Sequence, residues 1–176
     1  MPTAYVYAPF NGELLGQENY CGGGGHTHVR PGEGWDDPLD IEASGDTIVR
    51  FYASTAYVKS IRTQRVGWIC QDTSLFPYTY GVLVSLYKDT SGTNYIGGVM
   101  YGHLQISGRI VDGHYTSFYA IQIGKIIGST CLPCSCYKSP HIHMERRNGF
   151  RRDFSCCTCM DYMVYSGGDW IFGFTV

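Results

Sequence analysis

Residues 81–104 read GVLVSLYKDTSGTNYIGGVMYGHL, and their pattern indicates β-structure. Two runs of β-branched and aromatic residues, 81–87 and 96–104, stand on either side of the turn-forming pair Ser91-Gly92. Short runs of the same kind recur along the chain, and no helix of convincing length can be found between them. Many short strands without alternating helices are typical of antiparallel sheet, so the sequence predicts a sandwich or a partly open barrel.

Working outward from this stretch, the same signals predict nine strands. They span residues 4–7, 47–52, 56–63, 67–71, 81–87, 96–104, 117–121, 141–146 and 170–174. Two stretches, 18–38 and 128–140, carry Gly, Pro or Cys and are expected to form long loops, which in small domains are usually functional or pinned by covalent or metal links. Residues 1–150 are expected to form one domain, with 151–176 as a Cys-bearing extension packed on it.

Composition excludes several classes of protein. The chain has 176 residues, which fits one domain, and 44% of them are hydrophobic, which is enough for a core. With 13 Lys and Arg against 15 Asp and Glu, the net charge of -2 argues against a nucleic-acid partner. The longest apolar run, near 82–86, is too short to span a bilayer, and the N-terminal MPTAYVYAPF lacks the features of a signal peptide.

The histidines are unevenly placed, and two pairs stand out. His26 and His28 follow four glycines, and His141 and His143 form HIH just after Pro140. On a strand, His141 and His143 would project from the same face, about 6 to 7 Å apart. An isolated HxH is more often a pair of solvent-facing histidines, so this motif carries weight only together with other residues.

Asp40 supplies the second observation. It stands between Leu39 and Ile41 at the start of an expected strand, where a carboxylate is costly unless it is paired or bound to a ligand. Asp36 and Asp37, before Pro38, are better candidates for ordinary turn residues. Catalytic zinc sites use three nitrogen or oxygen ligands and leave one position for water, and two histidines with one aspartate meet that need. The HExxH helix signature is absent, so such a site would be built from strands and loops.

At this point the chain resembles the lysostaphin-type zinc endopeptidases, which cleave peptide cross-links in bacterial cell walls. The resemblance covers roughly residues 20–146 and lies in the order of its motifs: a loop histidine, then LDIEASGDTIV, YGVLVSL, MYGHLQ, IGKIIGST and SPHIHMER. It implies a curved antiparallel sheet with a groove across it, and residues 1–150 would be the catalytic domain.

Site residues follow from the resemblance one by one. Asp40 matches the zinc-binding aspartate, and His143 matches the second zinc-binding histidine. His141 matches the histidine that acts as general base or stabilises the transition state. His103, in YGHL, matches a second active-site histidine that steadies the water or the oxyanion. His114 has no counterpart and is expected to be structural or solvated, and Tyr78, Tyr80 and Tyr101 are expected to be mainly strand and core residues.

One position departs from the commonest family pattern, which has a histidine four residues before the aspartate. Asp36 stands there in this chain. The β-lytic branch of the family has a longer gap and a Gly-Gly-x-His entry, which resembles GGGGHTH. His26 is therefore our choice for the first zinc ligand, with His28 close behind and Asp36 as an unusual carboxylate alternative.

Eight cysteines need a separate explanation. Cys131, Cys134 and Cys136 form CLPCSC, Cys156, Cys157 and Cys159 form CCTC, and Cys21 and Cys70 stand apart. In an exported enzyme they could form disulfides, whereas thiolates could instead hold a structural zinc. We favour disulfides, since a cell-wall enzyme works outside the cytoplasm.

Three functions remain to be distinguished. The first is a zinc endopeptidase that acts on peptidoglycan, at an extracellular or cell-wall location. The second is a degenerate member of the same fold that binds wall peptides or a protein partner without cleaving. The third is an unrelated β-domain whose cysteines bind structural zinc.

Overall fold

The computed structural model describes residues 1–17, 34–45, 47–54, 56–67, 80–105, 119–121, 123–130, 140–154 and 163–176. These residues form strands and turns, with no helix among them. The strands are β1 (Thr3–Tyr7), β2 (Gly12–Gln17), β3 (Asp36–Glu42), β4 (Ile48–Arg50), β5 (Ser60–Gly67), β6 (Tyr80–Tyr87), β7 (Tyr95–Gln105), β8 (Tyr119–Ile121), β9 (Ile126–Thr130), β10 (His141–Arg147), β11 (Phe150–Arg151), β12 (Met163–Val164) and β13 (Trp170–Thr175).

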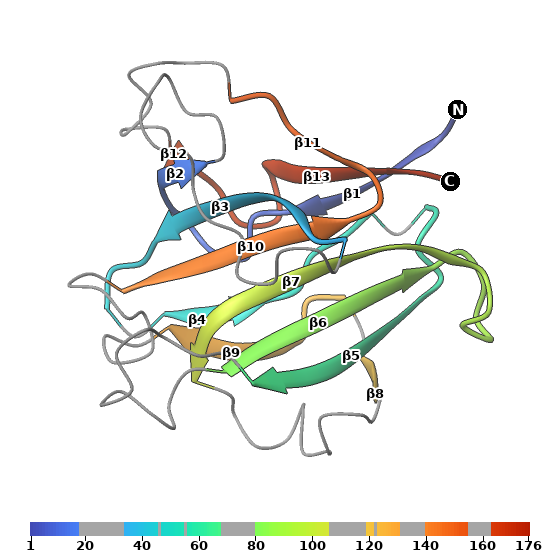
Figure 1. The fold of residues 1–176 in the computed structure, drawn as a ribbon, viewed down its shortest axis with the longest axis horizontal. Helices are drawn as coiled ribbons and strands as arrows, with labels where there is room; N and C mark the ends of the chain where they lie inside the picture. The colour runs from blue at the N-terminus through green and yellow to red at the C-terminus, as the bar shows by residue number, and fades with distance from the viewer. Residues whose placement is uncertain are drawn as a thin grey trace.

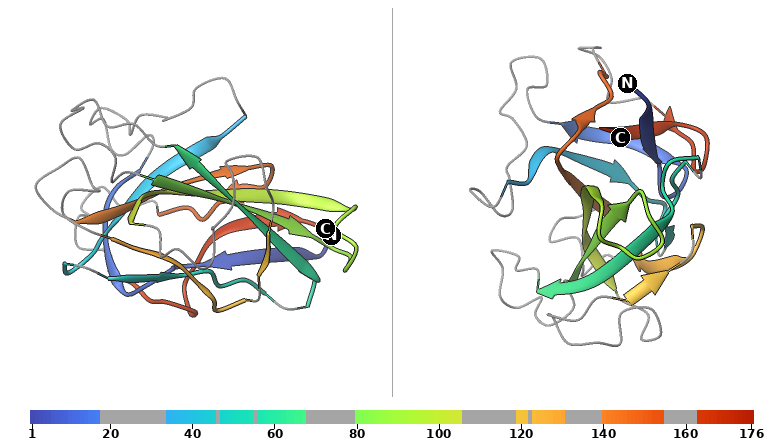
Figure 2. Two further views of the ribbon diagram at one scale, coloured as in Figure 1. Left: turned by 90° about the horizontal axis from the view of Figure 1, so that it is seen from below. Right: turned by 90° about the vertical axis from the view of Figure 1, so that its right-hand side faces the viewer.

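The strands form two sheets (Figure 1). The large sheet runs β12-β2-β3-β10-β7-β6-β5-β8, and β9 joins it by pairing with β7 and with β4. The small sheet has the order β1-β13-β11. Every pairing between strands is antiparallel. The large sheet curls strongly into a half-barrel (Figure 2), so the predicted mainly-β class with a curved antiparallel sheet is confirmed.

One hydrophobic core joins the two sheets. Ala4 and Val6 of β1 and Phe172 and Phe174 of β13 belong to the same buried cluster as Ile142 of β10. Phe174 packs so closely on β7 that a Cβ added to Gly97 would lie 2.4 Å from its ring. The core therefore occupies one face of the large sheet, and this face fixes the direction of the side chains on the central strands.

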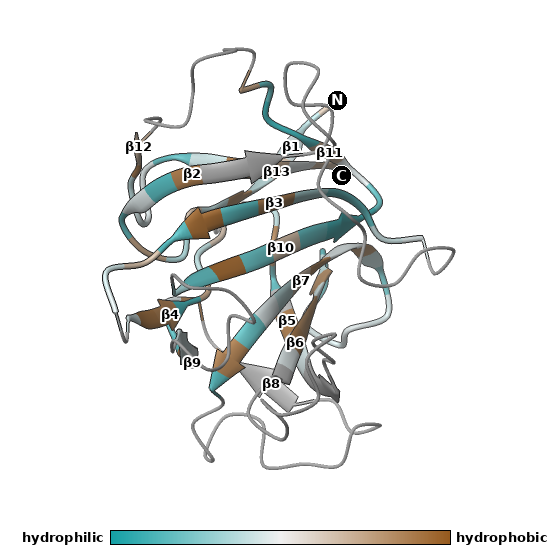
Figure 3. Cartoon of the chain, turned by 60° about the vertical axis from the view of Figure 1, so that its left-hand side comes forward, coloured by the Kyte–Doolittle hydropathy of each residue, from teal (hydrophilic) through white to brown (hydrophobic). Residues whose placement is uncertain are grey.

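Alternation along β10 determines which of its side chains point away from the core. Ile142 and Met144 point into the core, and hydrophilic residues alternate with them along the strand (Figure 3). His141, His143 and Glu145 are two residues apart and share the face that looks away from the core. All three are nonetheless buried.

The structure corrects the prediction that Asp36 and Asp37 lie in a turn, because they are the first residues of β3. Between the pairs Met144–Leu39 and Arg146–Asp36, the two residues Asp37 and Pro38 stand opposite the single residue Glu145. This is a β-bulge, and Asp37 has a positive φ of 52° in it. Proline is tolerated in strands at such irregularities, so a strand can begin where the sequence indicated a loop.

Other strand boundaries also differ from the prediction. β5 begins at Ser60 and continues to Gly67 without the predicted break after Thr63, because each of its residues pairs with β6. β2 and β9 were not predicted, since glycines interrupt their apolar pattern. The first three residues of the loop expected over 128–140 therefore belong to a strand, and residues 131–139 lie outside the described ranges. The predicted strand 67–71 lies mostly outside the described residues.

The segment after residue 150 contributes strands to both sheets. β13 is the middle strand of the small sheet, and β12 pairs with β2 at one edge of the large sheet. A helix with the length and apolar character needed to cross a membrane does not occur within the described ranges.

Candidate functional site

Strand register brings Asp40 and His143 together. Asp40 lies in the middle of β3, directly opposite His143 on β10, and Leu39 and Ile41 on either side of it point into the core. Asp40 therefore projects from the same face of the sheet as His141 and His143. The unfavourable position of a carboxylate between two apolar residues is resolved by this alternation, as strand periodicity allows.

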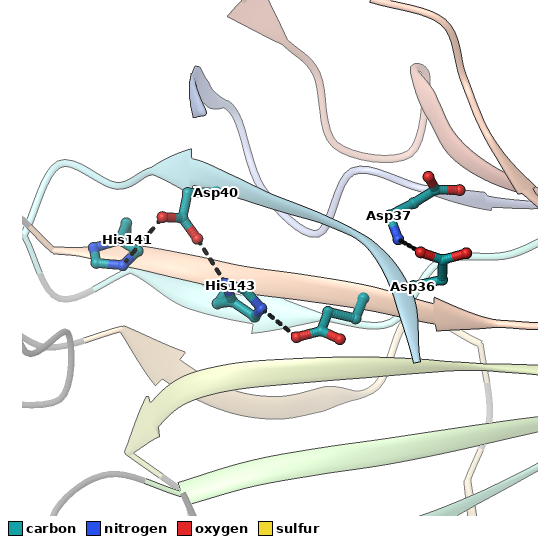
Figure 4. Close-up of polar contacts among 6 residues, drawn as sticks. Asp36, Asp37, Asp40, His141 and His143 are labelled. Atoms are coloured by element: carbon teal, nitrogen blue, oxygen red, sulfur yellow. Dashed lines mark hydrogen bonds and ion pairs between the residues drawn. The ribbon is translucent and has the colours of Figure 1, made fainter. Parts of the chain in front are cut away.

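His143 lies between two carboxylates. Its Nδ1 is 3.1 Å from Oδ1 of Asp40, and its Nε2 is 2.8 Å from Oε1 of Glu145. His143 is 1% exposed and Glu145 0%, so both contacts are shielded from water. Figure 4 shows Asp40 between His141 and His143, with the imidazole of His143 directed toward it.

His141 occupies the other side of Asp40. Its Nε2 lies 3.6 Å from Oδ2 of Asp40, and the residue is 2% exposed. The carboxylate of Asp40 thus faces both histidines of the HIH motif, with Oδ1 toward His143 and Oδ2 toward His141. His143 also contacts Glu145, through its other ring nitrogen.

A second bulge, in β7, places His103 beside these residues. Between the pairs Val82–Tyr101 and Tyr80–Leu104, Gly102 and His103 stand opposite the single residue Gly81. His103 takes a positive φ of 61° there, which is uncommon for a residue with a side chain. Strict alternation would place His103 on the core side with Tyr101, but the bulge turns its ring toward the site. Its ring centroid lies 4.8 Å from that of His141 and 6.0 Å from that of His143.

The electrostatics of His143 follow from these contacts. Burial opposes a charge on the ring, but the hydrogen bonds to Asp40 and Glu145 and the negative charges of both outweigh it. Together they raise the pKa of His143 to about 9. In the absence of a cation, the imidazole therefore holds protons on both nitrogens and donates one to each carboxylate.

The donor atoms of Asp40 and His143 fit a shared zinc ion. Two atoms bound to one tetrahedral zinc ion at about 2.0–2.2 Å lie about 3.3–3.6 Å apart. The observed 3.1 Å between Oδ1 and Nδ1 is close to that separation. Within the described ranges no group of three His, Cys, Asp or Glu side chains is arranged to hold a metal ion. His26 and His28, from which the third ligand is predicted, lie outside the described residues.

Asp36 is not brought to this site. It lies four residues from Asp40 along β3, about 13 Å in an extended strand. Its carboxylate is 3.3 Å from a guanidinium nitrogen of Arg146, which also contacts Asp37 at 2.6 Å. Figure 4 shows Asp36 and Asp37 at the start of β3, away from Asp40, His141 and His143. The structure thus gives no support to Asp36 as an alternative ligand.

The remaining residues singled out in the sequence lie away from this site or outside the described ranges. All eight cysteines, His114 and Tyr78 lie outside the described residues. Tyr101 is a core residue, as expected, packed edge-on against Phe51 with its ring fully buried. Burial raises the pKa of the Tyr101 hydroxyl.

Glu145 was not among the site residues expected from the sequence, yet it contacts His143. Glu145 is the next-to-last residue of the motif SPHIHMER, and the motif alone assigns it no role. The signal was nevertheless present, because His141, His143 and Glu145 alternate with apolar residues and must share one face of a strand.

Comparison with known proteins adds no relative: no family model, no curated protein and no solved structure matches the chain.

Proposed function

We propose that this protein is a zinc metalloendopeptidase that hydrolyses peptide bonds in bacterial cell-wall peptidoglycan. The observation that carries the proposal is the convergence of Asp40, His143, His141 and His103 from three neighbouring strands onto one face of the sheet. Buried polar side chains are costly unless they serve one another or a ligand, so four of them at one point favour a functional site.

Asp40 and His143 would hold the zinc ion, with His26 as the predicted third ligand. A bound zinc ion supplies Lewis acidity, which polarises a carbonyl group and acidifies water. Glu145 occupies Nε2 of His143, so Nδ1 is the atom that faces Asp40 and is placed to act as the donor. The two ligands come from adjacent strands in fixed register, which suits a rigid metal site.

His141 would handle the proton. Its ring lies beside Asp40, with Nε2 3.6 Å from Oδ2 of that carboxylate, and against the ring of His103. It would take a proton from the attacking water and later deliver it to the leaving amine. His103, against the ring of His141, would hydrogen-bond the developing oxyanion.

The choice of substrate rests on the resemblance in motif order to the lysostaphin-type enzymes. A peptidoglycan substrate places the protein outside the cytoplasm, where disulfides among the eight cysteines would form.

One observation favours the degenerate alternative, in which the fold binds wall peptides or a protein partner without cleaving them. Asp36, at the position where the commonest family pattern has a zinc-binding histidine, is engaged with Arg146. An enzyme therefore needs its third ligand from elsewhere, and a chain that lacks one would bind zinc weakly or not at all.

A pair of substitutions tests the proposal. Zinc content and the loss of turbidity of a cell-wall suspension are measured for the wild type, His141→Ala and His143→Ala. We expect His143→Ala to lose both zinc and activity, and His141→Ala to lose activity while keeping zinc. Equal loss of zinc in both variants would contradict this division of roles, and a wild type without zinc would favour the degenerate alternative.

A further inference from the structure

Glu145 is the most deeply buried carboxylate of the site. Its relative exposure is 0%, and its Oε1 lies 2.8 Å from Nε2 of His143. Burying a carboxylate costs free energy unless the group is well paired. The hydrogen bond to His143 offsets part of this cost, which links the burial of Glu145 to that contact. Glu145 is not among the predicted zinc ligands or catalytic histidines.

The backbone holds Glu145 firmly in place. It lies on β10, a central strand paired with β7 on one side, where Glu145 stands opposite Met100. On the other side, the bulge at Asp37 and Pro38 faces it. Because Glu145 and His143 are two residues apart on one strand, their side chains project side by side, and the hydrogen bond needs no movement of the chain.

We propose that Glu145 is a positioning residue that fixes the ring of His143, so that Nδ1 faces Asp40 and the shared metal position. This inference rests on the proposed zinc site and extends it by one residue. A histidine binds metal through a nitrogen that carries no proton, and the hydrogen bond made by the other nitrogen selects which one that is. By accepting from Nε2–H, Glu145 keeps the proton there and leaves Nδ1 for the metal.

The geometry supports an orientation that is set before metal arrives. Both nitrogens of His143 already face carboxylate oxygens, at 3.1 Å and 2.8 Å, so the ring plane is fixed along the line from Asp40 to Glu145. Without Glu145 the ring could rotate about its side-chain bonds, and binding would have to immobilise it. Loss of partners of this kind typically weakens metal affinity about 10- to 100-fold.

The first test measures zinc affinity of the full chain by competition with a chromophoric chelator. Glu145→Leu has no acceptor and should bind zinc about 10- to 100-fold more weakly than the wild type. Glu145→Gln keeps an oxygen that can accept from Nε2–H and should lose distinctly less. Asp153→Asn removes a carboxylate from an exposed position and should leave the affinity unchanged, which controls for net charge.

The second test identifies the metal-binding nitrogen with cadmium in place of zinc. Coupling between ¹¹³Cd and the imidazole protons in the wild type should assign the bond to Nδ1 of His143. This measurement decides the question even if Glu145→Leu does not fold.

The outcomes separate the two levels of the proposal. A folded Glu145→Leu variant that binds zinc as tightly as a zinc-binding wild type overturns the positioning role and leaves the endopeptidase proposal intact. Cadmium bound through Nε2 of His143 overturns it as well, because that atom cannot then donate to Glu145. A wild type that binds neither metal overturns the proposed zinc site, and the role of Glu145 falls with it.

Discussion

Asp40 and His143 are 103 residues apart in the chain, yet they stand directly opposite each other across the β3–β10 pair, with Oδ1 of Asp40 3.1 Å from Nδ1 of His143. Their meeting depends entirely on strand register. A slip of one residue would send Asp40 to the core side of the sheet and bring Leu39 or Ile41 to the polar side. The hydrophobic core of the protein therefore also specifies the site, because it fixes which residues of β3 and β10 point away from it.

The stability of the metal-free protein should depend on His143 and fall at alkaline pH. Its pKa is raised from 6.5 to about 9 in the folded state, so the folded protein binds this proton more tightly than the unfolded chain. The resulting stabilisation is complete below pH 6.5 and is lost as the pH rises through about 9, with a magnitude of about 3 kcal/mol. Urea unfolding in the presence of a chelator, at a series of pH values, measures this change in the free energy of unfolding.

A variant without the titrating ring provides the control for this effect. His143→Asn should lose most of the decline in the free energy of unfolding between pH 6.5 and 9. An unchanged decline in that variant would show that other groups cause it.

Because of the bulge at Gly102 and His103, His103→Asn is the substitution that best removes the imidazole without changing the backbone. Asparagine tolerates a positive φ better than most residues, so it should accept the backbone angle of 61° and preserve the bulge. If His103 stabilises the oxyanion, the rate of cell-wall hydrolysis should fall about 100- to 1000-fold while the zinc content stays at the wild-type level. Loss of zinc together with activity would instead indicate that the substitution disturbs the metal ligands.

The contact between β7 and the small sheet should be sensitive to a single methyl group. Gly97→Ala would place a Cβ 2.4 Å from Cδ1 of Phe174, deep in the core, and should lower the free energy of unfolding by about 1 to 3 kcal/mol. Gly168→Ala is the matched control, because its Cβ would meet nothing closer than 3.9 Å at an exposed turn. Urea denaturation of both variants tests the difference, and equal midpoints would contradict the packing described for Phe174.

Much of the fold could be predicted from the sequence because apolar alternation is visible in it. β6 and β7 carry long β-branched and aromatic runs, and Asn148-Gly149, at the turn between β10 and β11, has positive φ at both residues, as a turn of that composition favours. β2 could not be predicted, because Gly12 and Gly16 interrupt its apolar pattern. Its stability comes instead from pairing with β3. Tertiary pairing overrides weak local propensity in such strands.

The candidate site was only partly predictable, for a related reason. His141 and His143 share a face by simple alternation, and that part needed no structure. The position of His103 depends on a bulge opposite Gly81, and the strand character of Asp36 and Asp37 depends on a bulge opposite Glu145. A bulge shifts the alternation by one residue, and period-two reasoning cannot place it from sequence alone.

The claim that Asp40 and His143 share a metal ion is tested most directly by the zinc content of the dialysed wild type and of Asp40→Asn, measured side by side on folded protein. Asparagine keeps the size of the side chain but replaces the carboxylate with a neutral amide, whose oxygen is a much weaker zinc ligand. We expect the wild type to hold one zinc ion more per chain than the variant. If neither protein holds zinc, or if both hold the same amount, Asp40 and His143 do not share a metal ion.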